Sequence, residues 1–176
     1  MSDTGNEGGS YSWREDPLLW AYTLLLLVPV IMSIARYNYY GLAYLVYAGW
    51  ALMALSIIII FIAGGEFRRS GGAPEGESIV HTTVLVETGV YSVVRHPQYL
   101  GFLLIVAALV ALSQHPFSVI CAAAGCVLFY RDILREEQMS SSRLGEDYRR
   151  YMERVPRLNI IRGIYRRSSR GPGPRE

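Results

Sequence analysis

The chain has 176 residues, of which 51% are hydrophobic, and a net charge of +2. The apolar residues stand in long blocks, which favours a multi-spanning membrane protein over a soluble domain. All 17 basic residues are arginine, and from residue 131 onward twelve arginines face seven carboxylates, an excess of +5. A basic segment beside apolar runs is typical of a cytoplasmic membrane face, so we expect a lipid bilayer and no nucleic acid as partner. A solvated tail without a partner is the alternative.

The first 65 residues predict a polar leader and two membrane spans. Residues 1–16 are Gly-rich and acidic, which differs from a signal peptide and predicts a disordered cytoplasmic N-terminus. The segment 17–65 then holds apolar runs at 18–35 and 42–63, each long enough for a transmembrane helix. Gly64 and Gly65 are expected to end the second helix and to open a polar loop over 66–76.

A helical hairpin is predicted in the second half of the chain. Residues 78–94 are rich in Val and Thr and are expected to be extended or irregular, although a plain linker is the alternative. The next apolar region contains Ser-Gln-His-Pro at 113–116, where the proline breaks a helix. We therefore expect a third span at 99–112 and a fourth at 117–130, each about 21 Å long at the helical rise.

A polar helical region is expected after the fourth span. Gly145 predicts a break, and Pro156 follows a charged amphipathic segment at 147–154. The segment 161–176 is a basic tail whose end, from residue 168, is expected to be disordered. Two cysteines, Cys121 and Cys126, lie in the fourth apolar run at a spacing that predicts neither a disulfide nor a metal site.

Together these elements predict an all-α fold, a polytopic membrane helical bundle. It has about four transmembrane helices, a C-terminal helical hairpin and a cytoplasmic amphipathic helical tail. Arginines flank the ends of the second, third and fourth spans, whereas the two opposite loops hold one arginine, Arg36. By the positive-inside rule the protein is a multi-pass protein of the cell membrane with both termini cytoplasmic.

Polar residues gather on both sides of this hairpin. Tyr91, Arg95, His96 and Tyr99 precede or open the third span, and a Glu136-Glu137 pair follows the fourth. If the two spans form a hairpin, these groups meet on one membrane face, where charged groups indicate a functional site. The alternative is that Arg95 anchors in lipid headgroups and His96-Pro97 starts a helix.

These groups match the chemistry of S-adenosylmethionine. Carboxylates can hold a ribose diol or an amine, an aromatic ring attracts a sulfonium, and a helix start can bind a carboxylate. Methyl transfer then depends on positioning and on exclusion of water more than on acid–base catalysis. A carboxylate acceptor needs no base, whereas an amine acceptor needs Glu137 or a histidine to remove its proton.

The order of these residues resembles the isoprenylcysteine carboxyl methyltransferase family, whose signature is shared with membrane phospholipid methyltransferases. The resemblance rests on Gly89-x-Tyr91-x-x-x-Arg95-His96-Pro97-x-Tyr99, an apolar hairpin, Glu136-Glu137, and Leu144-Gly145-Glu146-Asp147-Tyr148-x-x-Tyr151. It covers residues 83–157, within a predicted methyltransferase core at 66–160. It implies an enzyme that transfers a methyl group from S-adenosylmethionine, its cofactor, to a membrane lipid or lipidated substrate.

The resemblance also implies site residues. The implied cofactor contacts are Thr83, Val84, Leu85, Val86, Tyr91, His96, Pro97, Gln98, Tyr99 and Glu136. The family's arginine four residues before that glutamate is Asp132 here, flanked by Arg131 and Arg135. We predict Arg131 on the substrate side and Glu137 as the second catalytic residue.

Two other functions remain open from the residues. A sterol-type reductase has a related hairpin and binds NADPH beside a motif with a glutamate after Tyr-x-Gly. Here Phe102 stands at that position, which disfavours a reductase. A non-enzymatic membrane scaffold would use the same polar groups as headgroup anchors.

Overall fold

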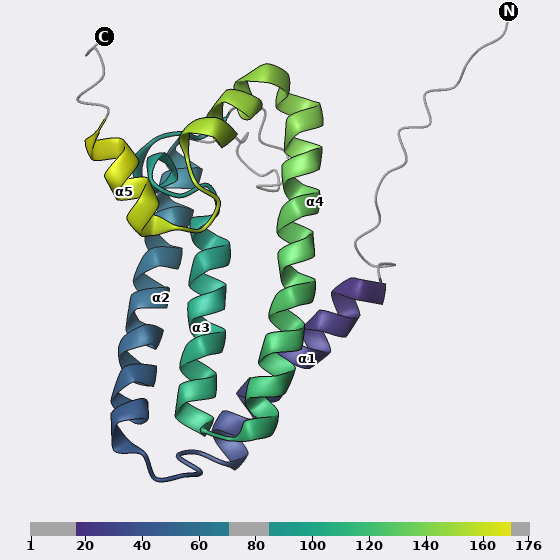
Figure 1. Ribbon diagram of the computed structural model, residues 1–176, viewed down its shortest axis with the longest axis vertical. Coiled ribbons are helices and arrows are strands. Elements are labelled where there is room, and N and C mark those ends of the chain that lie inside the picture. The colour runs from purple at the N-terminus through teal and green to yellow at the C-terminus, as the bar shows by residue number, and fades with distance from the viewer. Residues whose placement is uncertain (1–16, 71–84, 170–176) are drawn as a thin grey trace, which may run out of the picture.

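The computed structural model describes residues 17–70 and 85–169, and within these ranges it contains helices and no β-strand. The predicted all-α class is confirmed. The elements in chain order (Figure 1) are α1 (Pro17–Ala35), α2 (Ala43–Ser70), the 3₁₀-helix η3 (Gly89–Ser92), α3 (Pro97–Ser113), α4 (Pro116–Arg154) and α5 (Ile160–Ser168).

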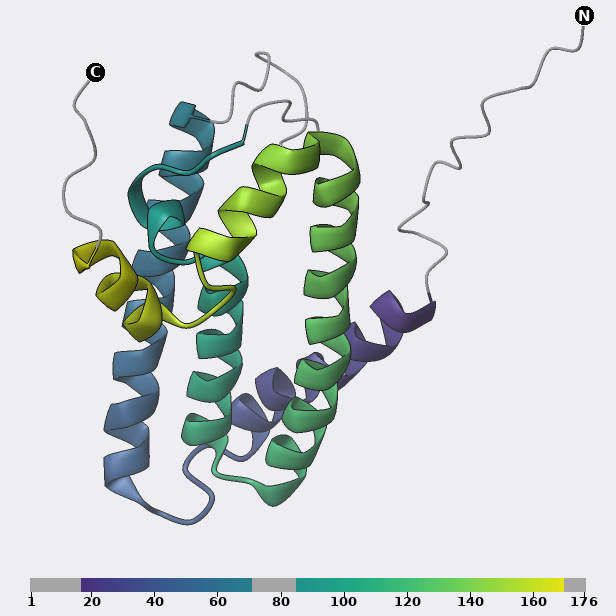
Figure 2. The ribbon, with the colours of Figure 1, turned by 45° about the horizontal axis from the view of Figure 1, so that its top comes forward.

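The loops after α1 and after α3 lie together at one end of the bundle (Figures 1 and 2). Gln114 joins them, because its side-chain amide donates to Asn38 Oδ1 at 2.8 Å and to the Leu42 carbonyl at 2.9 Å. The backbone N–H of Asn38 also donates to the Leu112 carbonyl at 2.8 Å. The residues that precede α3 and those of the second half of α4 therefore lie at the opposite end.

The helices pack in pairs, α3 along α2 and α4 on α1. Glycines permit both contacts. A Cβ at Gly101 would lie 2.4 Å from Ile60 Cγ1, and a Cβ at Gly125 would lie 2.7 Å from Leu26 Cδ2. Small residues at helix interfaces allow such close backbone approach in membrane bundles.

The apolar surface of the bundle faces outward. Among the described residues, α2 and α4 are long and apolar enough to cross a membrane, and α1 and α3 are apolar but shorter. Only 11% of the apolar window of α2 is buried inside the protein, and 33% of that of α4. A helix whose apolar side chains are exposed in this way needs lipid rather than water around it.

The second helix is longer than predicted. The expectation that Gly64 and Gly65 end it is wrong, because α2 continues to Ser70. A glycine inside a helix costs about 1 kcal/mol relative to alanine, and tertiary contacts override that cost here. Ala63 is fully buried beside Tyr91, and the Phe67 ring lies 5.9 Å from the Tyr91 ring.

The hairpin is confirmed, and its second arm is much longer than an apolar span alone. The predicted break at Gly145 is confirmed by its non-helical φ of 59° and ψ of −130° inside α4. The polar region from Arg131 onward continues the fourth helix beyond its apolar part. This part of α4 projects past the start of α3 (Figure 2).

Two short helices were not predicted. Gly89–Ser92 forms η3 where an extended or irregular segment was expected, and α5 occupies the first half of the predicted basic tail. The expectations for residues 1–16, 71–84 and 170–176 lie outside the described residues.

The close contact at Gly101 yields a test of the α2–α3 packing. We expect Gly101→Leu to destabilise the protein by about 1–3 kcal/mol, because overpacking a helix contact forces side chains and backbone apart. Gly65→Leu is the matched control, since a Cβ there meets nothing within 4 Å. Thermal unfolding in detergent should show a lower Tm for the first variant alone. Equal Tm values for both variants would contradict the packing described here.

Candidate functional site

The start of α3 and the polar part of α4 meet at one end of the bundle. His96 Nε2 lies 3.1 Å from Glu137 Oε1, and Arg95 Nη1 lies 2.8 Å from the same oxygen. His96 and Glu137 are 41 positions apart in the sequence. The prediction that the two segments meet is therefore confirmed.

Glu137 is the centre of a buried ionic cluster. Arg157 completes it, with Nε 2.9 Å from Oε1 and Nη2 2.5 Å from Oε2 of the carboxylate. We call Arg95, His96, Glu137 and Arg157 the Glu137 cluster. The Glu137 side chain is only 6% exposed. In this polar part of α4, burial raises the pKa of Glu137, but hydrogen bonds from His96 and Arg157 and the charge of Arg95 outweigh it and lower the pKa to about 2.

The chain after α4 is fastened over the start of α3. The backbone N–H groups of Arg95 and His96 donate to the carbonyls of Pro156 and Arg157, at 3.0 and 3.2 Å. The Tyr151 hydroxyl donates to the Tyr91 carbonyl at 2.7 Å. This fastening explains why Arg157, far from Glu137 in the chain, reaches its carboxylate.

A second, less enclosed group forms around Glu136. Tyr99 lies beside the carboxylate of Glu136, which is half-buried. The Tyr99 ring lies 5.5 Å from the His96 ring and 5.1 Å from the Phe129 ring. The structure therefore brings together Tyr99, His96 and Glu136, three of the predicted cofactor contacts, beside the Glu137 cluster.

The other predicted contacts are distributed differently. Val86 packs with Ala63 and Tyr91 in one apolar cluster, whereas Leu85 packs against Tyr148, Tyr151 and Val155 in another. Their side chains are therefore used in packing, which leaves the backbone to meet a ligand. Pro97 is buried in the first turn of α3, and the Gln98 amide is near Gly64 of α2. Thr83 and Val84 lie outside the described residues.

Arg131 does not join these groups. It is exposed, whereas the buried side of α4 is the stripe of Phe129, Ile133 and Glu137, four residues apart. At about 100° per residue, Arg131 stands some 200° around the helix from Phe129. The arginines that do reach the site are Arg95, which the sequence placed nearby without assigning a role, and Arg157, which no spacing rule connects to Glu137.

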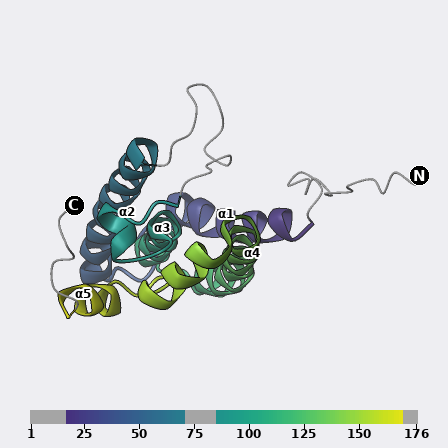
Figure 3. The same cartoon turned by 90° about the horizontal axis from the view of Figure 1, so that it is seen from above.

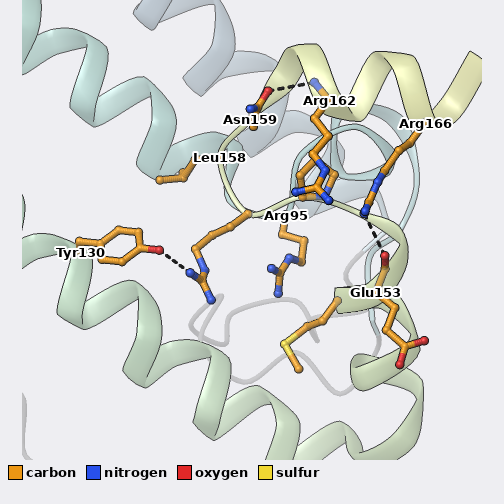
Figure 4. A pocket seen from close by; sticks show the side chains of 10 residues that line it. Arg95, Tyr130, Glu153, Leu158, Asn159, Arg162 and Arg166 are labelled. Atoms are coloured by element: carbon orange, nitrogen blue, oxygen red, sulfur yellow. Dashed lines mark hydrogen bonds between the residues drawn. The ribbon is translucent and has the colours of Figure 1, made fainter.

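Two cavities flank the site. A basic one of about 450 Å³ is lined mainly by Arg95, Tyr130, Glu153, Arg157, Arg162 and Arg166 (Figure 4). An apolar one of about 350 Å³ lies between α3 and α4, lined by Leu103, Cys126, Val127, Phe129, Tyr130 and Ile133. Because Tyr130 lines both, an apolar chain and a charged head can meet at this residue.

Buried N–H groups at the site remain without partners. Among the described residues, Arg95 Nε and Nη1 have no aligned hydrogen-bond acceptor, although Nη1 forms the ion pair with Glu137. Unpartnered buried donors are costly, and a bound anionic group would satisfy them. The arrangement thus offers an anion site, a carboxylate with an aromatic ring, and an apolar channel, all at one helix end.

Comparisons with known proteins identify this region. Residues 77–141 match the model of the isoprenylcysteine carboxyl methyltransferase (ICMT) family. The chain is 33% identical over 107 residues to protein-S-isoprenylcysteine O-methyltransferase of Homo sapiens, covering 60% of this chain and 36% of the relative. It is 29% identical over 145 residues to protein-S-isoprenylcysteine O-methyltransferase B of Arabidopsis thaliana, covering 77% of this chain and 71% of the relative.

No solved structure matches the chain. The chain spans 36% of the length of the human relative and 37% of that of the Rattus norvegicus relative, to which it is 31% identical. The matched segment contains the start of α3, the turn of the hairpin and both glutamates, whereas Arg157 lies beyond it. On these grounds the hairpin region of this chain is similar to the isoprenylcysteine carboxyl methyltransferase family.

Proposed function

We propose that this protein is an integral membrane methyltransferase that transfers a methyl group from S-adenosylmethionine to a lipidated carboxylate. The observation that carries the proposal is the meeting of the Tyr99–Glu136 pair, the unpartnered Arg95 Nε donor and the apolar cavity at one end of the α3–α4 hairpin. The relatives are named as O-methyltransferases of S-isoprenylcysteine, and an acceptor of that class fits this site.

The residues present fit the cofactor. S-adenosylmethionine carries a reactive sulfonium methyl, an amine, a carboxylate and a ribose diol, and it supplies the methyl group. Glu136 can accept hydrogen bonds from the diol or the amine while Tyr99 orients its carboxylate. The faces of Tyr99 and Tyr91 can attract the positive sulfur. We retain Thr83, Val84, Leu85, Val86, His96, Pro97 and Gln98 as proposed backbone or side-chain contacts.

The two cavities support a position for the acceptor. An isoprenoid chain can lie in the apolar cavity between α3 and α4, which removes apolar surface from water. Its carboxylate then lies near Tyr130 and the basic cavity, where Arg157 and Arg95 can orient it. The chain after α4, which is hydrogen-bonded to the start of α3, helps to exclude water from this region. Holding both reactants in line contributes more to such a transfer than proton removal does.

The electrostatics favour an oxygen acceptor over an amine. A carboxylate is already ionised near neutral pH, so the site needs no base. Glu137 is a weak base because its pKa is about 2 and its oxygens are occupied by Arg95, His96 and Arg157. We therefore propose that Glu137 positions the arginines, and that Arg131, if it contacts substrate, does so only at the edge of the site.

The distribution of arginine supports an orientation. The site end carries Arg68, Arg69, Arg95 and the arginines of α4 and α5, whereas the opposite loops carry Arg36 alone. By the positive-inside rule the site faces the cytoplasm, as do both termini, with four crossings of the cell membrane.

The test is a transfer assay with the purified full chain in lipid vesicles. Tritiated S-adenosylmethionine is offered with an N-acetylated S-farnesyl cysteine, and in parallel with phosphatidylethanolamine. We expect label in a base-labile methyl ester of the prenyl cysteine and none in the phospholipid amine. The same acceptor with its carboxylate already esterified is the control and should remain unlabelled. Label in the phospholipid alone would overturn the carboxylate assignment, and no binding of the cofactor by folded protein would overturn the enzyme assignment.

A further inference from the structure

The last described helix, α5, presents an apolar face that nothing in the described protein covers. Ile161, Ile164 and Tyr165 are spaced i, i+3 and i+4, so they share one side of the helix. They are 83%, 53% and 73% exposed. Gly163 faces the other way, where a Cβ would lie 1.9 Å from the Val93 carbonyl oxygen. The helix thus has one face against the protein and an apolar face directed outward.

This orientation is held by specific bonds. Asn159 Oδ1 accepts from the Arg162 backbone N–H at 2.9 Å and caps the helix. On the protein side, Arg166 Nη1 donates to the Glu153 carbonyl at 3.0 Å, and Arg167 Nη1 donates to Ser92 Oγ at 2.7 Å. The helix is therefore docked, and its apolar face is exposed because of that docking rather than because the helix is detached.

A row of arginines borders the apolar face. Arg162 and Arg166 are four residues apart, next to the apolar side, and both line the basic cavity. Figure 4 shows their side chains extending from α5 into the cavity that Arg95 also lines. Arg95 is 8% exposed and its Nε has no partner among the described residues. The cavity is lined by four arginines against one carboxylate, that of Glu153, and this charge balance favours an anion at the edge of an apolar helix face.

The position of α5 relates this surface to the bilayer. Figures 1, 2 and 3 all place α5 beside α2, at the end of the bundle where α3 begins. On α2, Ile58, Phe61 and Ile62 are exposed large hydrophobic residues. The helix α5, whose apolar face is exposed, thus lies beside a candidate span whose apolar side chains are also exposed, at the end of the bundle where α3 begins. An amphipathic helix with basic residues at this level has the composition of an interfacial helix.

We propose that α5 lies in the membrane interface and binds anionic phospholipid. Ile161, Ile164 and Tyr165 enter the boundary between headgroups and acyl chains. Arg162 and Arg166 hold the headgroup phosphate at the mouth of the basic cavity, on the α5 side. The proposal does not rest on methyl transfer, because none of its three apolar contacts and neither of these two arginines is assigned to the reaction.

The insertion is tested by spin labels on the full chain in phosphatidylcholine–phosphatidylglycerol nanodiscs. A label at Ile164→Cys, with Cys121→Ala and Cys126→Ala, should collide with dissolved oxygen more than with a water-soluble nickel complex. A label at Arg149→Cys, an exposed site on α4, should show the reverse. Aqueous behaviour of the Ile164 label would overturn the proposal. Protection from both reagents would overturn it as well, because a protein partner or a second copy would then cover the face.

Lipid binding is tested by titrating phosphatidylglycerol into the protein in neutral detergent. Each arginine near an anionic lipid surface strengthens binding about five-fold, so Arg162→Gln with Arg166→Gln should weaken it roughly 25-fold. Arg149→Gln with Arg150→Gln removes the same charge from exposed sites paired with Glu146, and should leave the affinity unchanged. Equal affinities for both double variants would overturn the headgroup site. Equal binding of inorganic phosphate would assign the cavity to a free anion instead. Neither readout uses activity, so failure here is separate from failure of the proposed function.

Discussion

Replacement of Glu137 by glutamine is expected to destabilise the protein by about 3–5 kcal/mol, the usual cost of removing one partner of a buried ion pair. The physical reason is that Arg95 and Arg157 both rely on this carboxylate, and Arg95 is 8% exposed. Without the charge, two guanidinium groups remain partly desolvated with no counter-ion. Thermal unfolding of the purified variant in detergent measures the loss.

The neighbouring residue supplies the control. Glu136→Gln changes the same chemistry one position along α4, but Glu136 lies outside the Glu137 cluster, so its Tm should stay near that of the wild type. Acid provides an independent check. The pKa of Glu137 is lowered from 4.5 to about 2, so its stabilisation is present above pH 4.5 and is lost as the pH falls toward 2. Glu137→Gln should lose this part of the acid dependence. An equally stable Glu137→Gln protein would show that the cluster contributes no net stability.

Glu136→Gln is expected to weaken binding of S-adenosylmethionine about 10- to 100-fold, the range for losing a hydrogen bond to a charged group. The variant keeps the size of the side chain but removes the negative charge that we assign to the cofactor's diol or amine. Isothermal titration of the purified protein measures the affinity directly.

The matched control for this binding experiment is Glu146→Gln, also on α4 but 62% exposed and paired only with surface arginines. It should bind the cofactor as the wild type does. Because Glu136→Gln is expected to fold normally, a lost affinity would report on the site rather than on the structure. Wild-type affinity in Glu136→Gln would remove this residue from the proposed cofactor contacts, and the enzyme assignment would then rest on the transfer assay.

The helical hairpin was predictable because its signals are local. The apolar blocks, the Ser-Gln-His-Pro sequence at 113–116 and the glycine at 145 act on the residues next to them. The structure confirms helices over the blocks, the turn between α3 and α4, and the break at Gly145. A hairpin with one break must bring the residue before its first arm near the residue after its second. The approach of the start of α3 to the two glutamates follows from that topology.

Helix ends that depend on distant contacts were not predictable. Gly64 and Gly65 have weak helix propensity, but the burial of Ala63 and Phe67 against Tyr91 extends α2 to Ser70. The docking of α5 depends in the same way on Gly163 meeting the Val93 backbone. Neither contact leaves a pattern in the neighbouring sequence.

The amino-acid sequence by itself determined that this protein is helical, apolar in blocks, basic at one end, and equipped with adjacent glutamates after its fourth apolar run. Only the tertiary structure decided which of the two glutamates is buried in the ionic cluster and which lies at its edge. Successive residues on a helix point about 100° apart, so one of the two had to face the bundle and the other its edge. The packing of α3 and the return of Arg157 buried Glu137 in an ionic cluster and left Glu136 beside Tyr99. Burial and charge are properties of the assembled neighbourhood, and they separate two side chains that are chemically identical in the sequence.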